Sequence, residues 1–273
     1  LPSSVYWAGI YTLGIRTLAG NPATFLSYGQ ESLKDHDLKL WRTGLPKAPE
    51  NLFKETNFTL TPNEAEFLRD CIAGSAKASL LNELASKQKS FGEDWAWQVH
   101  EDSVSDRNRS ILLHAQRFSG VMHGASILYN LLLAVRAAER PNAKKHGEAS
   151  ELIERYRRLL EGWREELQHL ALHSWDLDDL FQIVGSTSHN LTQSSREFVR
   201  SWLTIALQNT KSLETDQDAI SLLSRREHSL KRMKARLLHD APLERWSGES
   251  GLARLDFRWK ISRRYLGELV DVG

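Results

Sequence analysis

The stretch DRNRSILLHAQRFSGVMHGASILYNLLLAVRAAER, residues 106–140, decides the fold. Apolar side chains recur along it at the spacing of a helix. Through Ile127–Val135 they occupy more than one side of that helix, which is typical of an element surrounded by protein. The sequence therefore predicts a long central helix with other helices packed around it.

Further helical patterns lie on both sides of this stretch. One apolar stripe follows it at helical spacing: Leu152, Tyr156, Leu159, Leu160, Trp163, Leu167 and Leu170. Thr61-Pro62-Asn63-Glu64 is typical of a helix start with a capping box. Strand signals are limited to Asn57–Leu60 and Leu255–Trp259, too few for a sheet. We therefore predict a mainly α fold, a compact multi-helix protein with irregular connections and at most a few short strands.

The length of 273 residues allows a large core, and we expect a single helical unit over residues 1–273. Proline, asparagine, glycine and charged residues gather near 141–148, which marks a possible boundary between two lobes. One surface loop is the interpretation we favour there. Because the chain begins at Leu1 without an initiator methionine, we expect a fragment of a longer chain.

Composition excludes several classes of protein. Hydrophobic residues make up 41% and charged residues 26%, as in ordinary globular proteins and unlike disordered or fibrous chains. The single cysteine, Cys71, excludes an intrachain disulfide and a cysteine-based zinc site. No run approaches 18 apolar residues and no secretory signal is visible, so we expect a cytoplasmic protein without a membrane partner.

Charge is unevenly distributed along a chain whose net charge is only +1. Residues 225–264 hold 12 Lys or Arg against 5 Asp or Glu. We expect a helix running toward Leu238, anchored by an apolar stripe that includes Met233, with its cations facing outward. Outward cations suit contacts with phosphate groups. The alternative is a solvated helix whose cations pair with acids elsewhere in the fold.

The predicted phosphate contacts are the six cations around Glu227, namely Arg225, Arg226, Lys231, Arg232, Lys234 and Arg236. Arg254 and Arg258 are predicted as secondary contacts. They belong to RWSGESGLARLDFRW at 245–259, where Arg and Trp alternate around two glycines, a pattern suited to bases or phosphates. It matches neither a Walker loop nor a dinucleotide fingerprint. The alternative is a structural corner with its tryptophans buried.

Two histidine-containing groups suggest chemistry only weakly. His169 and His173 have the spacing of metal ligands on a helix, but no glutamate follows the first histidine as in zinc proteases. We predict no metal and no cofactor. His123, Tyr129 and Asn130 are polar residues in an apolar stretch, and they predict either a small polar site or a satisfied network within the core. The sequence leaves enzymatic activity open but favours its absence.

Several stretches together resemble an uncharacterised bacterial family, catalogued as domain of unknown function 6361. They are LPSSVYWAG at 1–9, GLPKAP at 44–49, FSGVMHGA at 118–125, LYNL at 128–131, WSGESG at 246–251 and RLDFRW at 254–259. The resemblance covers nearly the whole chain, but no catalytic motif comes with it. Genes of the family tend to lie beside helicase-like and nuclease-like genes, which implies a role near DNA or in a genome-defence complex.

We therefore predict a non-enzymatic nucleic-acid-binding subunit of a bacterial DNA-processing or anti-phage system, with DNA as its partner. A protein-interaction scaffold that docks an acidic partner, such as a helicase or nuclease subunit, is the alternative. An enzyme of unknown reaction, with a site near His123, Tyr129 and Asn130, is the third interpretation.

Overall fold

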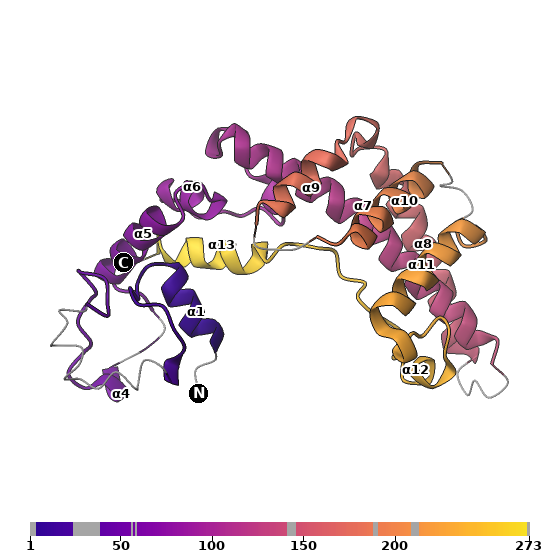
Figure 1. Ribbon diagram of the computed structural model, residues 1–273, viewed down its shortest axis with the longest axis horizontal. Helices are drawn as coiled ribbons and strands as arrows, with labels where there is room; N and C mark the ends of the chain where they lie inside the picture. Colours follow the sequence, from indigo (N-terminus) through magenta and orange to yellow (C-terminus); the bar gives the residue numbers. More distant parts are fainter. Residues whose placement is uncertain are drawn as a thin grey trace. The chain divides into compact units, whose positions relative to one another are not determined.

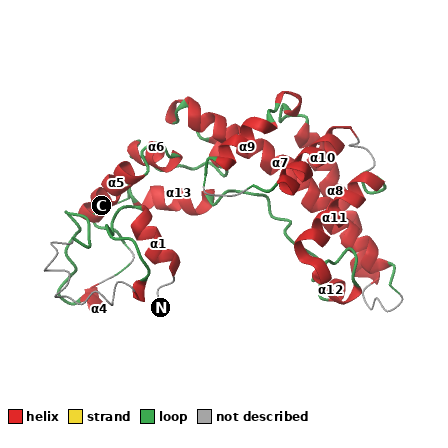
Figure 2. Ribbon diagram, viewed as in Figure 1, coloured by secondary structure: helices red, strands yellow, loops and turns green. Residues whose placement is uncertain are grey.

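The computed structural model describes residues 4–23, 39–55, 57, 59–140, 146–187, 191–208 and 213–271. These residues form helices and loops without a β-strand, and one isolated bridge pairs Arg16 with Trp41 (Figures 1 and 2). The predicted mainly α fold is confirmed. The two expected extended pieces are not strands: 57 and 59–60 are irregular, Phe58 lies outside the described residues, and Trp259 begins a helix.

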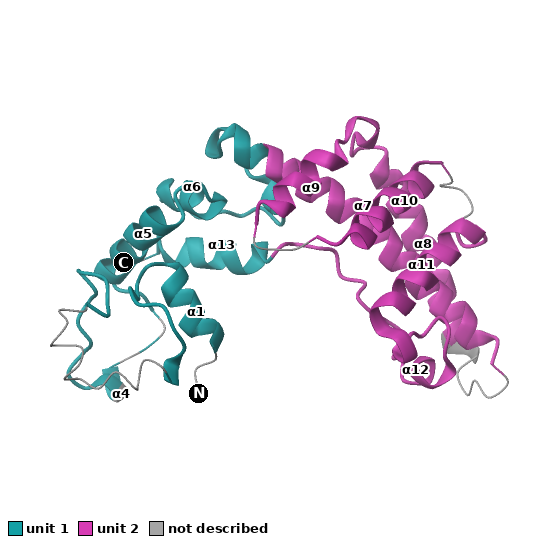
Figure 3. Ribbon diagram, viewed as in Figure 1, with its two compact units in different colours: residues 1–109, 258–273 teal, residues 110–257 magenta. Residues whose placement is uncertain are grey.

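The chain divides into two compact units, coloured separately in Figure 3. Unit 1 contains residues 1–109 and 258–273, and unit 2 contains residues 110–257. Unit 2 is thus inserted into the sequence of unit 1. The sequence placed a possible boundary near 141–148 instead, and residues 141–145 lie outside the described part of the chain.

Unit 1 is built from both ends of the chain. Its helices are α1 (Ser4–Thr12), α4 (Leu52–Glu55), α5 (Pro62–Ser75), α6 (Leu80–Ser86), η1 (Ala96–Gln98), η2 (Glu101–Ser103), the start of α7 (Asp106–Ala138) and α13 (Trp259–Glu268). The Trp259 indole Nε1 donates to the Glu93 carbonyl at 2.8 Å, which ties α13 to the loop before η1. The predicted capping box of α5 is confirmed, because the Thr61 hydroxyl accepts from the Glu64 N–H and the Glu64 carboxylate accepts from the Thr61 N–H.

Unit 2 packs its helices against α7. They are α8 (His146–Leu167), η3 (Leu172–Ser174), α9 (Leu177–Gly185), α10 (Gln193–Gln208), α11 (Gln217–Lys231), η4 (Arg232–Lys234) and α12 (Asp240–Glu244). Trp163 of α8 and Trp202 of α10 are both buried, and their indoles donate to the α7 carbonyls of Gly120 and Val121. The predicted central position of this helix is confirmed in unit 2.

Helix α7 is long and apolar enough to cross a membrane by length and composition alone. The sequence shows no unbroken apolar run of that length, because polar residues interrupt it. In the structure, 61% of its most apolar window is buried inside the protein, as in the core helix of a soluble protein.

Candidate interface for an anionic partner

The helix that carries the basic segment ends earlier than the sequence predicts. α11 stops at Lys231, and Arg232 adopts a φ of +49°, outside the helical region. The expected continuation toward Leu238 is therefore wrong. Met233, expected on the buried stripe, follows this break and is 73% exposed.

Glu227 is the physical reason for this early end. Its side chain is buried, and its carboxylate accepts hydrogen bonds from the N–H groups of Arg236 at 3.0 Å and Leu237 at 2.9 Å. In a continuous helix those two amides would bond to carbonyls four residues earlier and would lie far from Glu227. The buried carboxylate therefore holds the chain after η4 back against α11.

Two side chains complete the surroundings of Glu227. The Tyr129 hydroxyl of α7 donates to the carboxylate, and the Lys231 ammonium lies 3.2 Å from it. Burial raises the pKa of Glu227, but these hydrogen bonds outweigh burial and hold that pKa below its ordinary value. Burial and the neighbouring carboxylate both raise the pKa of Tyr129. The pair is therefore an ionised carboxylate beside a neutral phenol.

The Arg/Trp loop at 245–259 is a structural corner rather than an open loop. The Asn130 side chain accepts from the Ser250 N–H at 2.7 Å and donates to the Ser250 carbonyl at 2.9 Å. The Tyr156 hydroxyl of α8 donates to the Gly248 carbonyl. Trp259 is buried, as the structural alternative expects, whereas Trp246 is only partly buried.

Three of the six cations predicted to contact phosphate bind other side chains of this protein. Arg226 donates to the Ser195 hydroxyl at 3.1 Å and stacks over Phe198. Lys231 is paired with Glu227, and Arg236 donates to the Ser250 hydroxyl at 2.7 Å. These three side chains therefore support the structure of this region.

The other three, Arg225, Lys234 and Arg232, are exposed. Arg225 donates to the Ser221 carbonyl of its own helix. Within the described part of the chain, none of the three lies at ion-pair distance from a carboxylate. Because Glu227 is turned inward, the outer surface of residues 225–236 carries positive charge alone.

Large apolar side chains lie among these cations, and sequence reasoning missed them. Leu230 is 65% exposed and Met233 is 73% exposed. Ala219 and Leu223 lie on the buried face of α11, and Leu230 lies on the same face at helical spacing. At Leu230 the core no longer covers this face. We call Arg225, Leu230, Arg232, Met233 and Lys234 the α11 tip; α11 is labelled in Figure 1.

The two predicted secondary contacts differ in their surroundings. Arg254 forms an ion pair with Glu166 of α8 and donates to the Ser119 hydroxyl of α7. Arg258 is exposed, adopts a left-handed backbone conformation just before α13, and belongs to unit 1. The role of both residues as contacts stays a prediction.

A family profile described as "Family of unknown function (DUF6361)" matches residues 1–273, the full length of the chain. The chain belongs to this family. The resemblance in the sequence is thereby confirmed. No curated protein matches the DUF6361 chain, and no solved structure matches it.

The structure does not bring His123, Tyr129 and Asn130 of the DUF6361 chain into one polar site. Tyr129 is bound to Glu227, and Asn130 is bound to Ser126 and Ser250, as in a satisfied core network. His123 Nδ1 is buried without a hydrogen-bond partner among the described residues. Burial, and then the positive charge of Arg254, lower the pKa of His123.

The two histidines with metal-ligand spacing are exposed residues around the end of α8 and in η3. His169 lies two residues after the end of α8, and His173 lies within η3, so one continuous helix does not carry both. Among the residues that the structure describes, no three His, Cys, Asp or Glu side chains are grouped as metal ligands.

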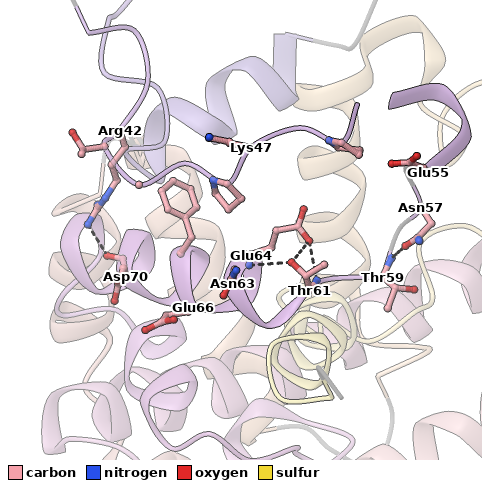
Figure 4. Close-up of a pocket in the computed structure, with 15 residues that line it drawn as sticks. Arg42, Lys47, Glu55, Asn57, Thr59, Thr61, Asn63, Glu64, Glu66 and Asp70 are labelled. Atoms are coloured by element: carbon pink, nitrogen blue, oxygen red, sulfur yellow. Dashed lines mark hydrogen bonds between the residues drawn. The ribbon is translucent and has the colours of Figure 1, made fainter. Parts of the chain in front are cut away.

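Unit 1 of the DUF6361 chain contains an open depression of about 930 Å³, shown in Figure 4. It lies between the loop that carries Arg42 and Lys47 and the first turns of α5. Arg42 donates to the Asp70 carbonyl at 3.2 Å, and Glu64 is held by Thr61 in the capping box. Both charge signs line it and none of the buried unpaired atoms lies in it, so we assign no ligand to it.

Proposed function

We propose that this DUF6361 chain is a non-enzymatic binding subunit that docks an anionic macromolecule on the α11 tip. One observation carries the proposal: the only acid of residues 225–236, Glu227, is buried, whereas Arg225, Arg232 and Lys234 face solvent. A surface of one charge sign attracts partners of the opposite sign. The setting we propose, on the family resemblance, is a cytoplasmic DNA-processing or anti-phage complex of bacteria.

The number of available cations changes the expected strength of binding to nucleic acid. Six phosphate contacts predict a slope of about −5 in a plot of log affinity against log salt on duplex DNA, and three contacts predict about −3. Nucleic acid and an acidic protein segment are both anionic macromolecules, so either one fits the proposal. Binding to either is therefore expected to weaken with salt.

The test compares the wild-type protein with a variant that carries Arg225→Ala, Arg232→Ala and Lys234→Ala. The probes are a labelled DNA duplex and labelled polyglutamate, measured by fluorescence anisotropy from about 50 to 300 mM salt. We expect at least one probe to bind the wild-type protein, and the triple substitution to weaken that binding and flatten its salt dependence.

A matched control removes the same charge elsewhere. Lys77, Arg158 and Lys260 are also exposed, and the triple variant Lys77→Ala, Arg158→Ala, Lys260→Ala should bind like the wild-type protein. Failure of both probes to bind at the lowest salt would overturn the proposal. Equal losses in the two triple variants would also overturn it, because they would show a response to net charge alone.

A further inference from the structure

The α11 tip presents more than positive charge. Leu230 and Met233 are 65% and 73% exposed, and Leu238, which follows η4, is 46% exposed. Single apolar residues on a surface need no explanation, but neighbouring exposed ones are typical of interaction sites. Phosphate contacts make no use of aliphatic side chains, and residues 225–238 contain no Phe, Tyr or Trp on which bases could stack.

The exposure of these side chains is imposed by a well-connected turn. Arg136 of α7 donates to the carbonyls of Leu237 and Leu238 and to the Asp240 carboxylate. On the other side, the Glu227 carboxylate holds the Arg236 and Leu237 amides. Because hydrogen bonds fix the backbone of this turn on both sides, binding does not have to order that backbone.

Arg232 adds a conformational observation. Its φ of +49° with a ψ of −119° is rare for a residue with a side chain, and such conformations persist only where their surroundings impose them. The turn places Arg232 and Met233 side by side in η4, directly after Leu230 and Lys231 of the last turn of α11. Apolar and cationic residues therefore alternate along the chain from Leu230 to Lys234.

We propose that the anionic partner is an amphipathic protein segment, whose apolar side chains cover Leu230 and Met233 while its carboxylates face Arg232 and Lys234. This inference rests on the function proposed above. Methionine is common at surfaces that accept varied apolar partners, because its side chain is flexible and polarizable. Because Arg232 and Lys234 have no carboxylate at ion-pair distance in the described part of the chain, a negatively charged partner complements them.

The test uses a labelled helical peptide with leucines at i, i+3, i+4 and i+7 and glutamates elsewhere. The variant Leu230→Ser, Met233→Ser removes the apolar part of the α11 tip and keeps its charge. We expect the peptide to bind the wild-type protein, and this double substitution to weaken binding at least about tenfold, because burial of each apolar side chain contributes to affinity.

The matched control is Val5→Ser, Tyr6→Ser on α1, where the two side chains are 71% and 73% exposed. This variant should bind the peptide like the wild-type protein. Circular dichroism and thermal unfolding check that each variant is folded, which is expected because the replaced side chains lie outside the core.

The outcomes separate the two proposals. If the charge triple variant loses DNA or peptide binding while Leu230→Ser, Met233→Ser has no effect, the protein-segment inference is overturned and the proposed function stands. If the charge triple variant has no effect on any probe, the proposed function is overturned too. Failure of the peptide to bind while DNA binds also overturns the inference, in favour of nucleic acid.

Methionine oxidation provides an independent measurement. The chain has two methionines, and Met122 is packed against the core whereas Met233 is exposed. Mild peroxide should therefore oxidise Met233 first, and the polar sulfoxide should weaken peptide binding. Met233→Leu should keep its binding after the same treatment. Unchanged binding of the oxidised wild-type protein would contradict a role for Met233.

Discussion

At the residue scale, close packing in unit 2 depends on Gly124 of α7. A Cβ atom added there would lie 2.1 Å from the Trp163 ring, which is buried and donates to the Gly120 carbonyl at 2.7 Å. Glycine inside a helix costs about 1 kcal/mol relative to alanine. Glycine is required at this position because any side chain there would prevent the Trp163 indole from reaching the α7 backbone.

We therefore predict that Gly124→Ala destabilises the protein by about 1–3 kcal/mol, since overpacking forces neighbouring side chains to move. Gly162→Ala on α8 is the control, because nothing lies within 4 Å of an added Cβ there. That substitution should be neutral or stabilise by up to about 1 kcal/mol. Urea unfolding measures the free energy of unfolding of both variants. Equal changes in the two variants would contradict the packing argument.

At the element scale, helix starts follow local sequence signals more closely than helix ends do. Thr61 and Glu64 cap α5 as predicted, and the side chain of Asp216 caps the start of α11. The end of α11 depends instead on Glu227, whose partners Tyr129 and Leu237 lie 98 and 10 residues away in the sequence. No local pattern encodes a contact of that kind.

We predict that Glu227→Gln lowers the free energy of unfolding by about 1.5–3 kcal/mol at neutral pH, the usual contribution of hydrogen bonds to a charged group. The pKa of Glu227 is lower in the folded protein than its ordinary value of 4.5. Its ionised form therefore stabilises the fold above about pH 4.5, and this stabilisation is lost as the pH falls through the folded pKa.

Chemical unfolding between about pH 6 and 3 tests this prediction. The wild-type protein should lose stability more steeply with acid than the Glu227→Gln variant. Glu161→Gln, which removes an exposed carboxylate from α8, should follow the wild-type curve. Parallel curves for the wild-type protein and the Glu227→Gln variant would show that the buried carboxylate does not contribute in this way.

At the scale of the whole molecule, the main hydrophobic cluster lies within unit 2, between Val121 and Leu252. Unit 1 has a separate set of buried residues, which includes Cys71, Leu84 and Leu266, whereas its helix α1 has none. A unit with its own core is expected to fold without the rest of the chain.

We therefore predict that residues 106–257, which keep α7 from its first residue, form a soluble helical fragment with one cooperative unfolding transition. Circular dichroism during urea unfolding provides the measurement, and the full chain is the reference. A fragment that unfolds gradually, or that binds a dye for exposed apolar surface, would show that unit 2 needs unit 1 for its packing.

The sequence by itself determined the helical class, the central helix α7, the buried face of α8 and the start of α5. These features depend on apolar spacing and caps, which act within one or two turns of the chain. Tertiary structure alone decided where α11 ends, which three of the six cations bind other side chains, and that Leu230 and Met233 are exposed. The physical reason is that side chains of α7, about 100 or more residues before their partners in the sequence, hold α11 and the chain that follows it. Tyr129 donates to Glu227, Asn130 accepts from the Ser250 N–H, and Arg136 donates to the Leu237 carbonyl.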